Sequence, residues 1–301
     1  MNIYLPIAEM SVNIFTILGL GWFAGVLSGL FGIGGGFLMT PFLIFLGVPP
    51  AVSVSTVANQ IIASSATGFL TQWRRGNVDF KMGWYLLAGG MVGSTLGVSL
   101  FRWLKELGYI DLMISLSYVT FLGIVGILMA RDSVRALKKL PKKTSVAVRQ
   151  PLAKRLPFKV QFPHSKMDIS AIMPLAIGFV VGIMASLMGI SGGFFLIPAL
   201  MYVVGMPTST VIGTSLFQTI FITANVTLLQ AVTTQTVDIL LALLLVAGSV
   251  PGVRMGTRLG NKLPADHLRA LLAALVLGMA IKLAWGLFTP PADIFSVSVM
   301  E

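Results

Sequence analysis

Two stretches of neutral hydroxyl and amide side chains are the groups in this sequence best suited to bind an anion. Their members recur at spacings of three or four residues, which places them on one face of a helix: Thr56, Asn59 and Gln60 in the first stretch, and Thr214, Ser215 and Gln218 in the second. Such groups donate hydrogen bonds without acting as a base, so they suit a tetrahedral oxyanion. The alternative is that they only bond neighbouring membrane helices, at about 0.6 kcal/mol each.

A glycine-rich motif inside an apolar segment precedes each polar stretch. The first motif runs from Gly32 to Gly36, and the second, 157 residues later, runs from Gly189 to Gly193. A helix interrupted there leaves backbone N–H groups unpaired, which a membrane tolerates only inside protein or beside water. The helix that follows each break would direct its N-terminal partial charge at an anion. We therefore expect both breaks to line the substrate site, although glycines can also serve close helix packing alone. The residues concerned are Gly34, Gly35, Gly36, Ser191, Gly192 and Gly193.

The two motifs belong to a longer internal repeat. From Gly21 to Leu43, ten of 23 positions are identical to those of the segment that begins at Gly178. The match continues beyond the motif, because Val78-Asp79 corresponds to Val237-Asp238. A broken apolar helix repeated in both halves is typical of the substrate site of a membrane transporter.

The composition is that of an integral membrane protein. The chain is 56% hydrophobic and 10% charged, with a mean hydropathy of +0.91, whereas soluble domains carry about 25% charged residues. It contains no cysteine, which excludes disulfides and thiol catalysis. The two histidines have no partner at metal-ligand spacing, and no nucleophile is paired with a base. We expect no catalytic residue, no metal and no cofactor, and hence no enzyme.

The apolar segments predict an all-α membrane protein built from two homologous halves, with about eight membrane helices. Two of these helices would be broken or re-entrant at the glycine motifs. The first repeat comprises residues 1–130, a basic loop 131–170 follows, and the second repeat comprises residues 171–301. The expected segments are 12–31, 37–47, 52–72, 82–104 and 110–130 in the first half, and 171–188, 194–204, 209–231, 236–258 and 266–288 in the second.

The net charge of +11 is concentrated in one loop. Residues 131–170 hold eleven Lys or Arg and two Asp, a net charge of +9. A basic loop between membrane helices indicates the cytoplasmic side and contact with anionic lipid headgroups. We therefore expect membrane lipids as partners and no nucleic acid.

Charge also bears on the orientation of the two halves. If each broken segment crosses the membrane, the halves are parallel, and 15 Lys or Arg lie inside and six outside. If each broken segment enters and leaves on one side, the second half is inverted, and 18 lie inside and three outside. The positive-inside rule favours inverted repeats, with both termini outside.

These motifs resemble those of the TauE/SafE sulfite exporter family. The resemblance rests on the two glycine motifs, each followed by Phe and Pro, on Gly213-Thr-Ser-Leu216, and on the late run from Pro251 to Leu259. It covers about 260 residues. The first half departs from it, since it reads Ser55-Thr-Val-Ala58 where the second half has Gly213-Thr-Ser-Leu216.

The resemblance implies a bacterial or archaeal inner-membrane carrier of sulfite, thiosulfate or an organosulfonate. We expect a secondary transporter that moves this small anion by alternating access. The alternatives are a passive anion channel and a carrier for a non-sulfur organic anion. The sequence leaves open the coupling ion, the direction of transport and whether the chain forms a homo-oligomer.

Overall fold

The structure is a computed structural model that describes residues 2–31, 36–137, 159–162, 167–190, 192–260 and 265–288. Ten α-helices make up most of these residues, so the protein is all-α, as predicted. The helices of the first half are α1 (Ile14–Phe31), α2 (Gly36–Phe45), α3 (Pro50–Arg74), α4 (Phe80–Glu106) and α5 (Ile110–Leu137). Those of the second half are α6 (Ile172–Met188), α7 (Gly192–Pro198), α8 (Thr208–Thr233), α9 (Ile239–Gly260) and α10 (Ala265–Phe288), and a π-helical segment (Ala199–Val204) extends α7.

Local sequence explains where several helices begin and end. Asp79 precedes α4, and its carboxylate accepts the Met82 N–H at 3.0 Å, which makes it a helix N-cap. Asp238 caps α9 in the same way through Leu241 N–H, also at 3.0 Å. Gly189 ends α6 with a φ of 59°, a left-handed conformation that favours glycine. The second glycine motif therefore does interrupt the apolar segment, as its composition predicted.

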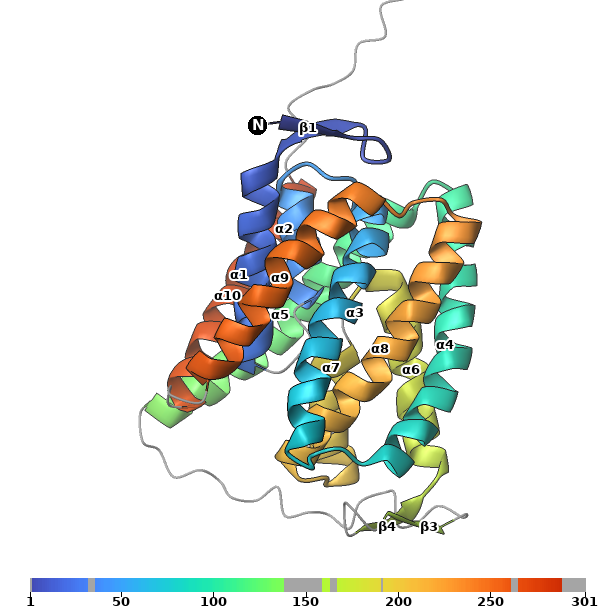
Figure 1. The fold of residues 1–301 in the computed structure, drawn as a ribbon, viewed down its shortest axis with the longest axis vertical. Helices are drawn as coiled ribbons and strands as arrows, with labels where there is room; N and C mark the ends of the chain where they lie inside the picture. The colour runs from blue at the N-terminus through green and yellow to red at the C-terminus, as the bar shows by residue number, and fades with distance from the viewer. Residues whose placement is uncertain are drawn as a thin grey trace, which may run out of the picture.

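Two short hairpins, which the sequence analysis did not anticipate, lie at opposite ends of the helices. Strands β1 (Asn2–Leu5) and β2 (Met10–Asn13) pair at the upper end in Figure 1, and the turn between them donates from Ile7 N–H to Asp238 Oδ2 at 3.2 Å. Strands β3 (Lys159–Phe162) and β4 (Met167–Ser170) pair at the lower end, where Lys81 Nζ donates to the Gln161 carbonyl at 2.7 Å. The expected loop 131–170 thus contains the end of α5 and this second hairpin.

The first helix of each half packs against the fourth helix of the other half. Helix α1 lies along α9 and α6 lies along α4, while α3 contacts α8 and α5 contacts α10. Glycines allow the close approach. A Cβ added to Gly25 would meet the Ser249 carbonyl oxygen at 2.3 Å, and one on Gly93 would meet that of Phe179 at 2.1 Å. Gly25 and Gly93 therefore serve helix packing.

Helices α3 and α8, which hold corresponding places in the two halves, run in opposite directions. Helix α3 begins at the upper end in Figure 1, where Ala51 N–H donates to Asp111 Oδ1 of α5, and it ends at the lower end. Helix α8 begins at the lower end, close to Asn77, and ends at the upper end, where Lys105 Nζ donates to the Thr234 carbonyl. The names upper and lower end are used below in this sense.

Within the part of the chain that the structure describes, five segments are long and apolar enough to cross a membrane. They are Ile14–Phe31, Phe80–Glu106, Ile110–Ile127, Thr210–Thr233 and Ile239–Gly260. Gly36–Phe45, Ile172–Met188 and Leu271–Leu287 are shorter apolar helices. The protein is therefore a multi-pass membrane protein.

Candidate functional site

The described parts of the two glycine breaks meet inside the protein. Phe37 and Phe194, which follow the two motifs, stack with ring centroids 4.3 Å apart. Gly36 is buried, and an added Cβ would lie 2.1 Å from Ile61 Cδ1 and 3.3 Å from the Gly189 carbonyl oxygen. The second break reaches Gly192 and Gly193, the first two residues of α7. Gly34, Gly35 and Ser191 lie outside the described residues, so the predicted substrate contacts of the breaks stay predictions.

A pair of crossed hydrogen bonds joins each polar helix to the other half. Thr56 Oγ1 on α3 accepts the Asp238 N–H at 3.1 Å, and Thr214 Oγ1 on α8 accepts the Asp79 N–H at 3.0 Å. All four side chains are buried. Each threonine therefore supports the start of a span in the opposite half, while its hydroxyl hydrogen can still be donated elsewhere.

Gln60 and Gln218 occupy equivalent positions, 158 residues apart, and both lie in the interior. Gln60 is fully buried, and neither Oε1 nor Nε2 has a hydrogen-bond partner. Gln218 donates from Nε2 to the Leu86 carbonyl at 3.2 Å, but its Oε1 is also unpartnered. Because buried polar groups are nearly always hydrogen-bonded to protein or water, these atoms are candidates for ligand or water contacts. Ser65 Oγ on α3 is also buried and has no hydrogen-bond partner.

The last two predicted side chains are engaged more locally. Ser215 is buried, and its Oγ donates to the Ile212 carbonyl at 3.0 Å within α8. Asn59 Nδ2 donates to the Thr56 carbonyl at 3.5 Å. Asn59 also faces a hollow between α3 and α9, which Val237 and Ala242 help to line. The structure thus places Asn59 on a different side of α3 from the lower cavity described next.

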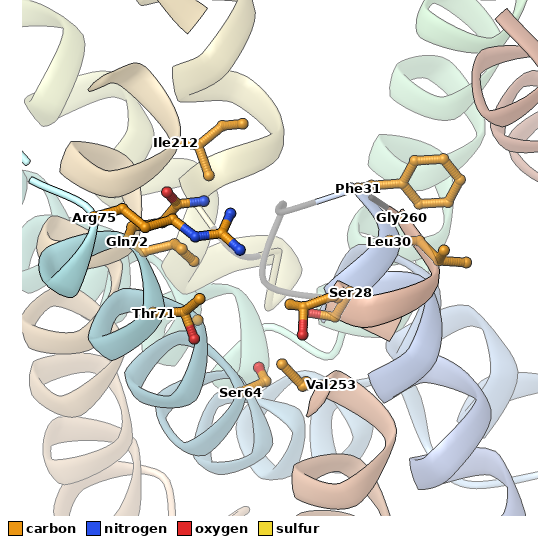
Figure 2. A pocket seen from close by; sticks show the side chains of 14 residues that line it. Ser28, Leu30, Phe31, Ser64, Thr71, Gln72, Arg75, Ile212, Val253 and Gly260 are labelled. Carbon is orange, nitrogen blue, oxygen red and sulfur yellow. The ribbon is translucent and has the colours of Figure 1, made fainter. Parts of the chain in front are cut away.

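A cavity of ≈ 170 Å³ opens at the lower end between α1, α3, α8 and α9 (Figure 2). Drug-sized ligands occupy sites of roughly 300–1,000 Å³, so this lower cavity suits a small ion. No Asp or Glu of the described chain is among its lining residues. They are Ser28, Gly29, Leu30, Phe31, Ser64, Gly68, Thr71, Gln72, Arg75, Ile212, Leu216, Val253, Thr257 and Gly260.

One face of α3 supplies the polar wall of the lower cavity. Ser64, Thr71 and Arg75 continue, at helical spacing, the stripe that includes Gln60. Sequence reasoning places Ser64 on the same polar face but ends the candidate site at Gln60, and it misses Thr71 and Arg75. The signal that could have found them is the continuation of the polar and small-residue spacing to the end of the helix.

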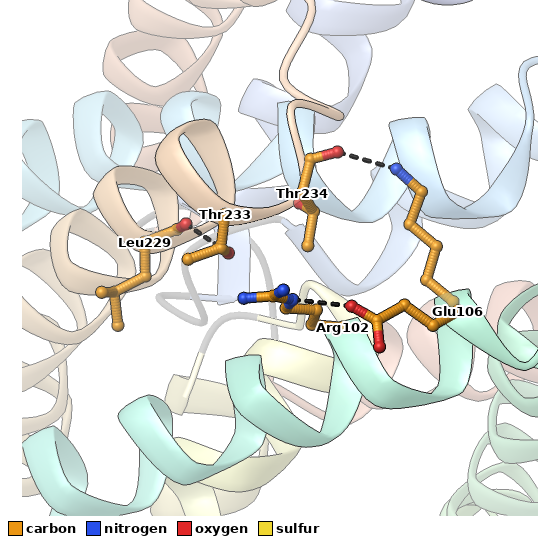
Figure 3. A network of polar contacts seen from close by, with 6 residues as sticks. Arg102, Glu106, Leu229, Thr233 and Thr234 are labelled. Atoms are coloured by element: carbon orange, nitrogen blue, oxygen red, sulfur yellow. Dashed lines mark hydrogen bonds and ion pairs between the residues drawn. The ribbon is translucent and has the colours of Figure 1, made fainter.

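A second cavity, of ≈ 300 Å³, lies at the upper end between α4 and α8 and is called the upper cavity below. Arg102 and Thr233 are among its lining residues, together with Glu106. Figure 3 shows Arg102 Nε paired with Glu106 Oε1 at 2.8 Å, and Thr233 Oγ1 donating to the Leu229 carbonyl at 2.7 Å. The arginine of the upper cavity is therefore neutralised by its neighbour on the same helix.

The route inward from the upper cavity is filled by apolar side chains. Val98 of α4, Ala185 of α6, and Ile222 and Val226 of α8 form one buried cluster, and Leu229 packs against it. On α8 these residues take the positions that Ser64, Gly68 and Thr71 hold on α3, again 158 residues apart. At these equivalent positions α3 therefore lines a cavity with polar or small residues, whereas α8 is packed with apolar ones.

Among the residues that the structure describes, no group of three or more His, Cys, Asp or Glu could hold a metal ion.

Comparison with known proteins gives one consistent answer. A family model described as "Sulfite exporter TauE/SafE" matches residues 17–283. The chain is similar to the probable membrane transporter protein YjnA of Bacillus subtilis, at 28% identity over 89% of this chain and 98% of that protein. It is also similar to YunE of the same organism, at 26% identity over 93% and 100%. A short segment, 14% of this chain and 10% of the relative, is 49% identical to Sulfite exporter TauE/SafE family protein 1 of Arabidopsis thaliana. No solved structure matches the chain at a significant level.

Proposed function

The chain belongs to the TauE/SafE sulfite exporter family of membrane transporters, and from this premise we propose that it carries a small sulfur-containing anion. The substrate class is sulfite, thiosulfate or an organosulfonate. The protein acts as a secondary transporter of the inner membrane, by alternating access and without catalysing a reaction.

The observation that carries the proposal is the unpartnered buried amide groups of Gln60 and Gln218. They lie at equivalent positions of the two halves. Gln60 leaves its whole amide without a protein partner, whereas Gln218 leaves only its Oε1, an acceptor, and has one N–H of Nε2 beyond the one that it donates to Leu86. An amide N–H₂ can donate to an oxyanion, and this neutral donor needs no compensating carboxylate. Thr56, Thr214 and Ser215 lie within one turn of these glutamines on α3 and α8. The threonine hydroxyls would complete a neutral donor set, and Ser215 would join it by exchanging its bond to the Ile212 carbonyl for one to the anion.

The arrangement of helices supports inverted-topology repeats with about eight membrane helices. Helices α3 and α8 run in opposite directions, and α1 and α6 each lead to a short returning helix. In this arrangement the lower end is cytoplasmic. It contains Arg74, Arg75 and Lys81, whereas Arg102 and Lys105 lie at the upper end, in agreement with the positive-inside rule.

The two cavities support alternating access. The lower cavity reaches Ser64, one turn from Gln60, whereas the equivalent position on α8, Ile222, is buried in an apolar cluster. This arrangement fits an inward-facing carrier in which one side opens at a time. A passive anion channel would instead need a continuous path.

Uptake into proteoliposomes tests the proposal. The purified protein is reconstituted, and entry of labelled sulfite, thiosulfate and a sulfonate is compared with entry of labelled acetate. We expect saturable sulfur-anion transport at carrier rates. Acetate-only transport would establish the alternative of a non-sulfur organic anion carrier, and single-protein currents in a planar bilayer would establish a channel.

A further inference from the structure

Arg75 is the one cationic side chain among the described residues that line the lower cavity. It follows the end of α3 and is exposed, and in Figure 2 its side chain extends over the cavity toward the side where Ser28 and Phe31 lie. The guanidinium forms no ion pair with any carboxylate of the described residues, where the single ion pair joins Arg102 and Glu106. Its charge is therefore available to a ligand.

Gln72, about one helical turn before Arg75, supplies a second donor in the cavity wall. Gln72 Oε1 accepts from Asn77 Nδ2 at 3.1 Å. This bond fixes which end of the Gln72 amide faces Asn77, and it leaves the N–H₂ group as the donor that remains. Ser28, which is buried, contributes a hydroxyl from α1.

The other half of the protein has no such charge at the equivalent place. Position 233, which corresponds to Arg75, is a threonine whose hydroxyl donates to its own helix. The upper cavity does contain Arg102, but Glu106 holds it at 2.8 Å. Of the two cavities, only the lower one presents an unopposed positive charge among its described lining residues.

We propose that the lower cavity is an anion-capture site in which Arg75 and the Gln72 amide bind a small oxyanion on the cytoplasmic side, before it reaches the neutral donors near Gln60. The planar guanidinium binds two oxygens of a sulfur oxyanion at once, and this geometry favours XO₃-type anions over chloride. The inference rests on the proposed function for its substrate class, but the cavity itself requires only an oxyanion.

Charge on one side alone makes the two faces of the carrier unequal. An anion approaching from the lower end meets net positive charge, and one approaching from the upper end meets a neutral pair. We therefore expect a lower KM for substrate presented to the lower face, and we expect this advantage to shrink as salt rises, because exposed charges are screened.

The test compares Arg75→Gln with Arg74→Gln in the full-length protein. Arg74→Gln is the matched control, because it removes the same charge one residue away, at an exposed position that does not line the cavity. Binding of sulfite, thiosulfate and methanesulfonate is measured by calorimetry in phospholipid-free detergent. We expect Arg75→Gln to raise Kd roughly 5- to 30-fold, and Arg74→Gln to leave it within about twofold. The Kd of Arg75→Lys should lie between these values, because lysine keeps the positive charge but lacks the planar guanidinium that binds two oxygens at once.

Equal Kd values for Arg75→Gln and Arg74→Gln would overturn the inference while leaving the transport proposal intact. If the wild type binds no sulfur anion, the transport proposal fails. The capture site is then tested with acetate and phosphate in the same assay. Binding of either anion that is weakened by Arg75→Gln supports the capture site, and no such binding overturns it.

A lipid headgroup is the other source of an oxyanion at this depth. If the difference between the two variants is absent in detergent and appears only after phosphatidylglycerol is added, Arg75 holds a lipid phosphate and the capture site is refuted. A difference already present without phospholipid supports it. In sided vesicle assays, Arg75→Gln should raise KM from the lower face alone.

Discussion

Helices α3 and α8 hold equivalent places in the two halves but present different surfaces. Their upstream parts match closely, since Thr56 and Thr214 make the same bond to the opposite half and Gln60 and Gln218 are both buried. Beyond these residues Ser64, Gly68 and Thr71 of α3 line the lower cavity. The equivalent positions on α8 are apolar: Ile222 and Val226 are buried in one cluster, and Leu229 packs against it.

The difference shows which features the duplicated scaffold requires and which are free to diverge. The bonds that position the helices are kept in both copies, because losing either would leave a buried donor unsatisfied. The downstream surfaces are not constrained in that way, and one is polar and charged whereas the other is apolar. A symmetric fold can thus carry an asymmetric path for an anion.

The largest effect is expected at Gly213 on α8, whose equivalent on α3 is Ser55. A Cβ on Gly213 would lie 2.0 Å from the Asn77 carbonyl oxygen, and backbone cannot move aside cheaply. We expect Gly213→Ala to destabilise the protein by on the order of 3 kcal/mol and to reduce the yield of monodisperse protein in size-exclusion chromatography.

Ser55→Ala is the control for that substitution. Ser55 Oγ contacts Thr236 Oγ1 at 2.6 Å, and Thr236 keeps a second partner in Thr234, so the loss is about 1 kcal/mol. A Gly213→Ala protein as stable as the Ser55→Ala protein would show that the close approach to Asn77 is not required.

The open and closed sides can be compared by thiol labelling, because the chain has no cysteine of its own. Gly68→Cys on α3 and Val226→Cys on α8 occupy equivalent positions. Gly68 lines the lower cavity, whereas Val226 is buried in the apolar cluster. We expect a membrane-impermeant maleimide to modify Gly68→Cys at least about tenfold faster, and from the cytoplasmic face, because labelling follows exposure of the thiol. Equal rates would contradict the one-sided opening.

A smaller effect is expected where the two helices are alike. Each neutral hydrogen bond contributes roughly 0.5–1.5 kcal/mol, so Gln60→Ala or Gln218→Ala should weaken substrate affinity about 2- to 13-fold. The double variant should weaken it further. Affinity is read from KM in proteoliposomes, with expression as the folding control. Unchanged affinity for every sulfur anion in the double variant would place the site on other helices.

The smallest effect concerns the charge of the upper cavity. Glu106→Gln removes the partner of Arg102 and should make the upper cavity resemble the lower one. Because both side chains are about 60% exposed (59% and 61%), we expect only about a two- to threefold fall in KM from the upper face, lost at high salt. If Glu106→Gln leaves the KM from the upper face unchanged at low salt, charge in this cavity does not affect substrate capture.

Local patterns in the sequence were sufficient to predict most of the helical framework. The apolar segments and the second glycine break follow from residue types and spacing, and the structure confirms them. The polar face of α3 was likewise recognisable from its spacing. The two hairpins were not, because each is only a pair of four-residue strands with little apolar alternation.

Contacts between distant segments limited the prediction of the site. The bonds of Thr56 and Thr214 join residues more than 130 positions apart, so no local spacing reveals that these hydroxyls support opposite helix starts. Arg75 could be counted only as one charge of the cytoplasmic side. Its place over a cavity depends on where α1, α8 and α9 pack against α3.

The exchange of first helices between the halves has a consequence for biosynthesis. The glycine face of α1, including Gly21 and Gly25, is completed by Leu245 and Ser249 of α9, more than 220 residues later in the chain. A nascent first half therefore inserts with an unsatisfied packing surface, and this surface must wait until nearly the whole protein has been translated. Native packing of α1 therefore occurs late in synthesis of the chain, and truncation before α9 would leave α1 without its partner.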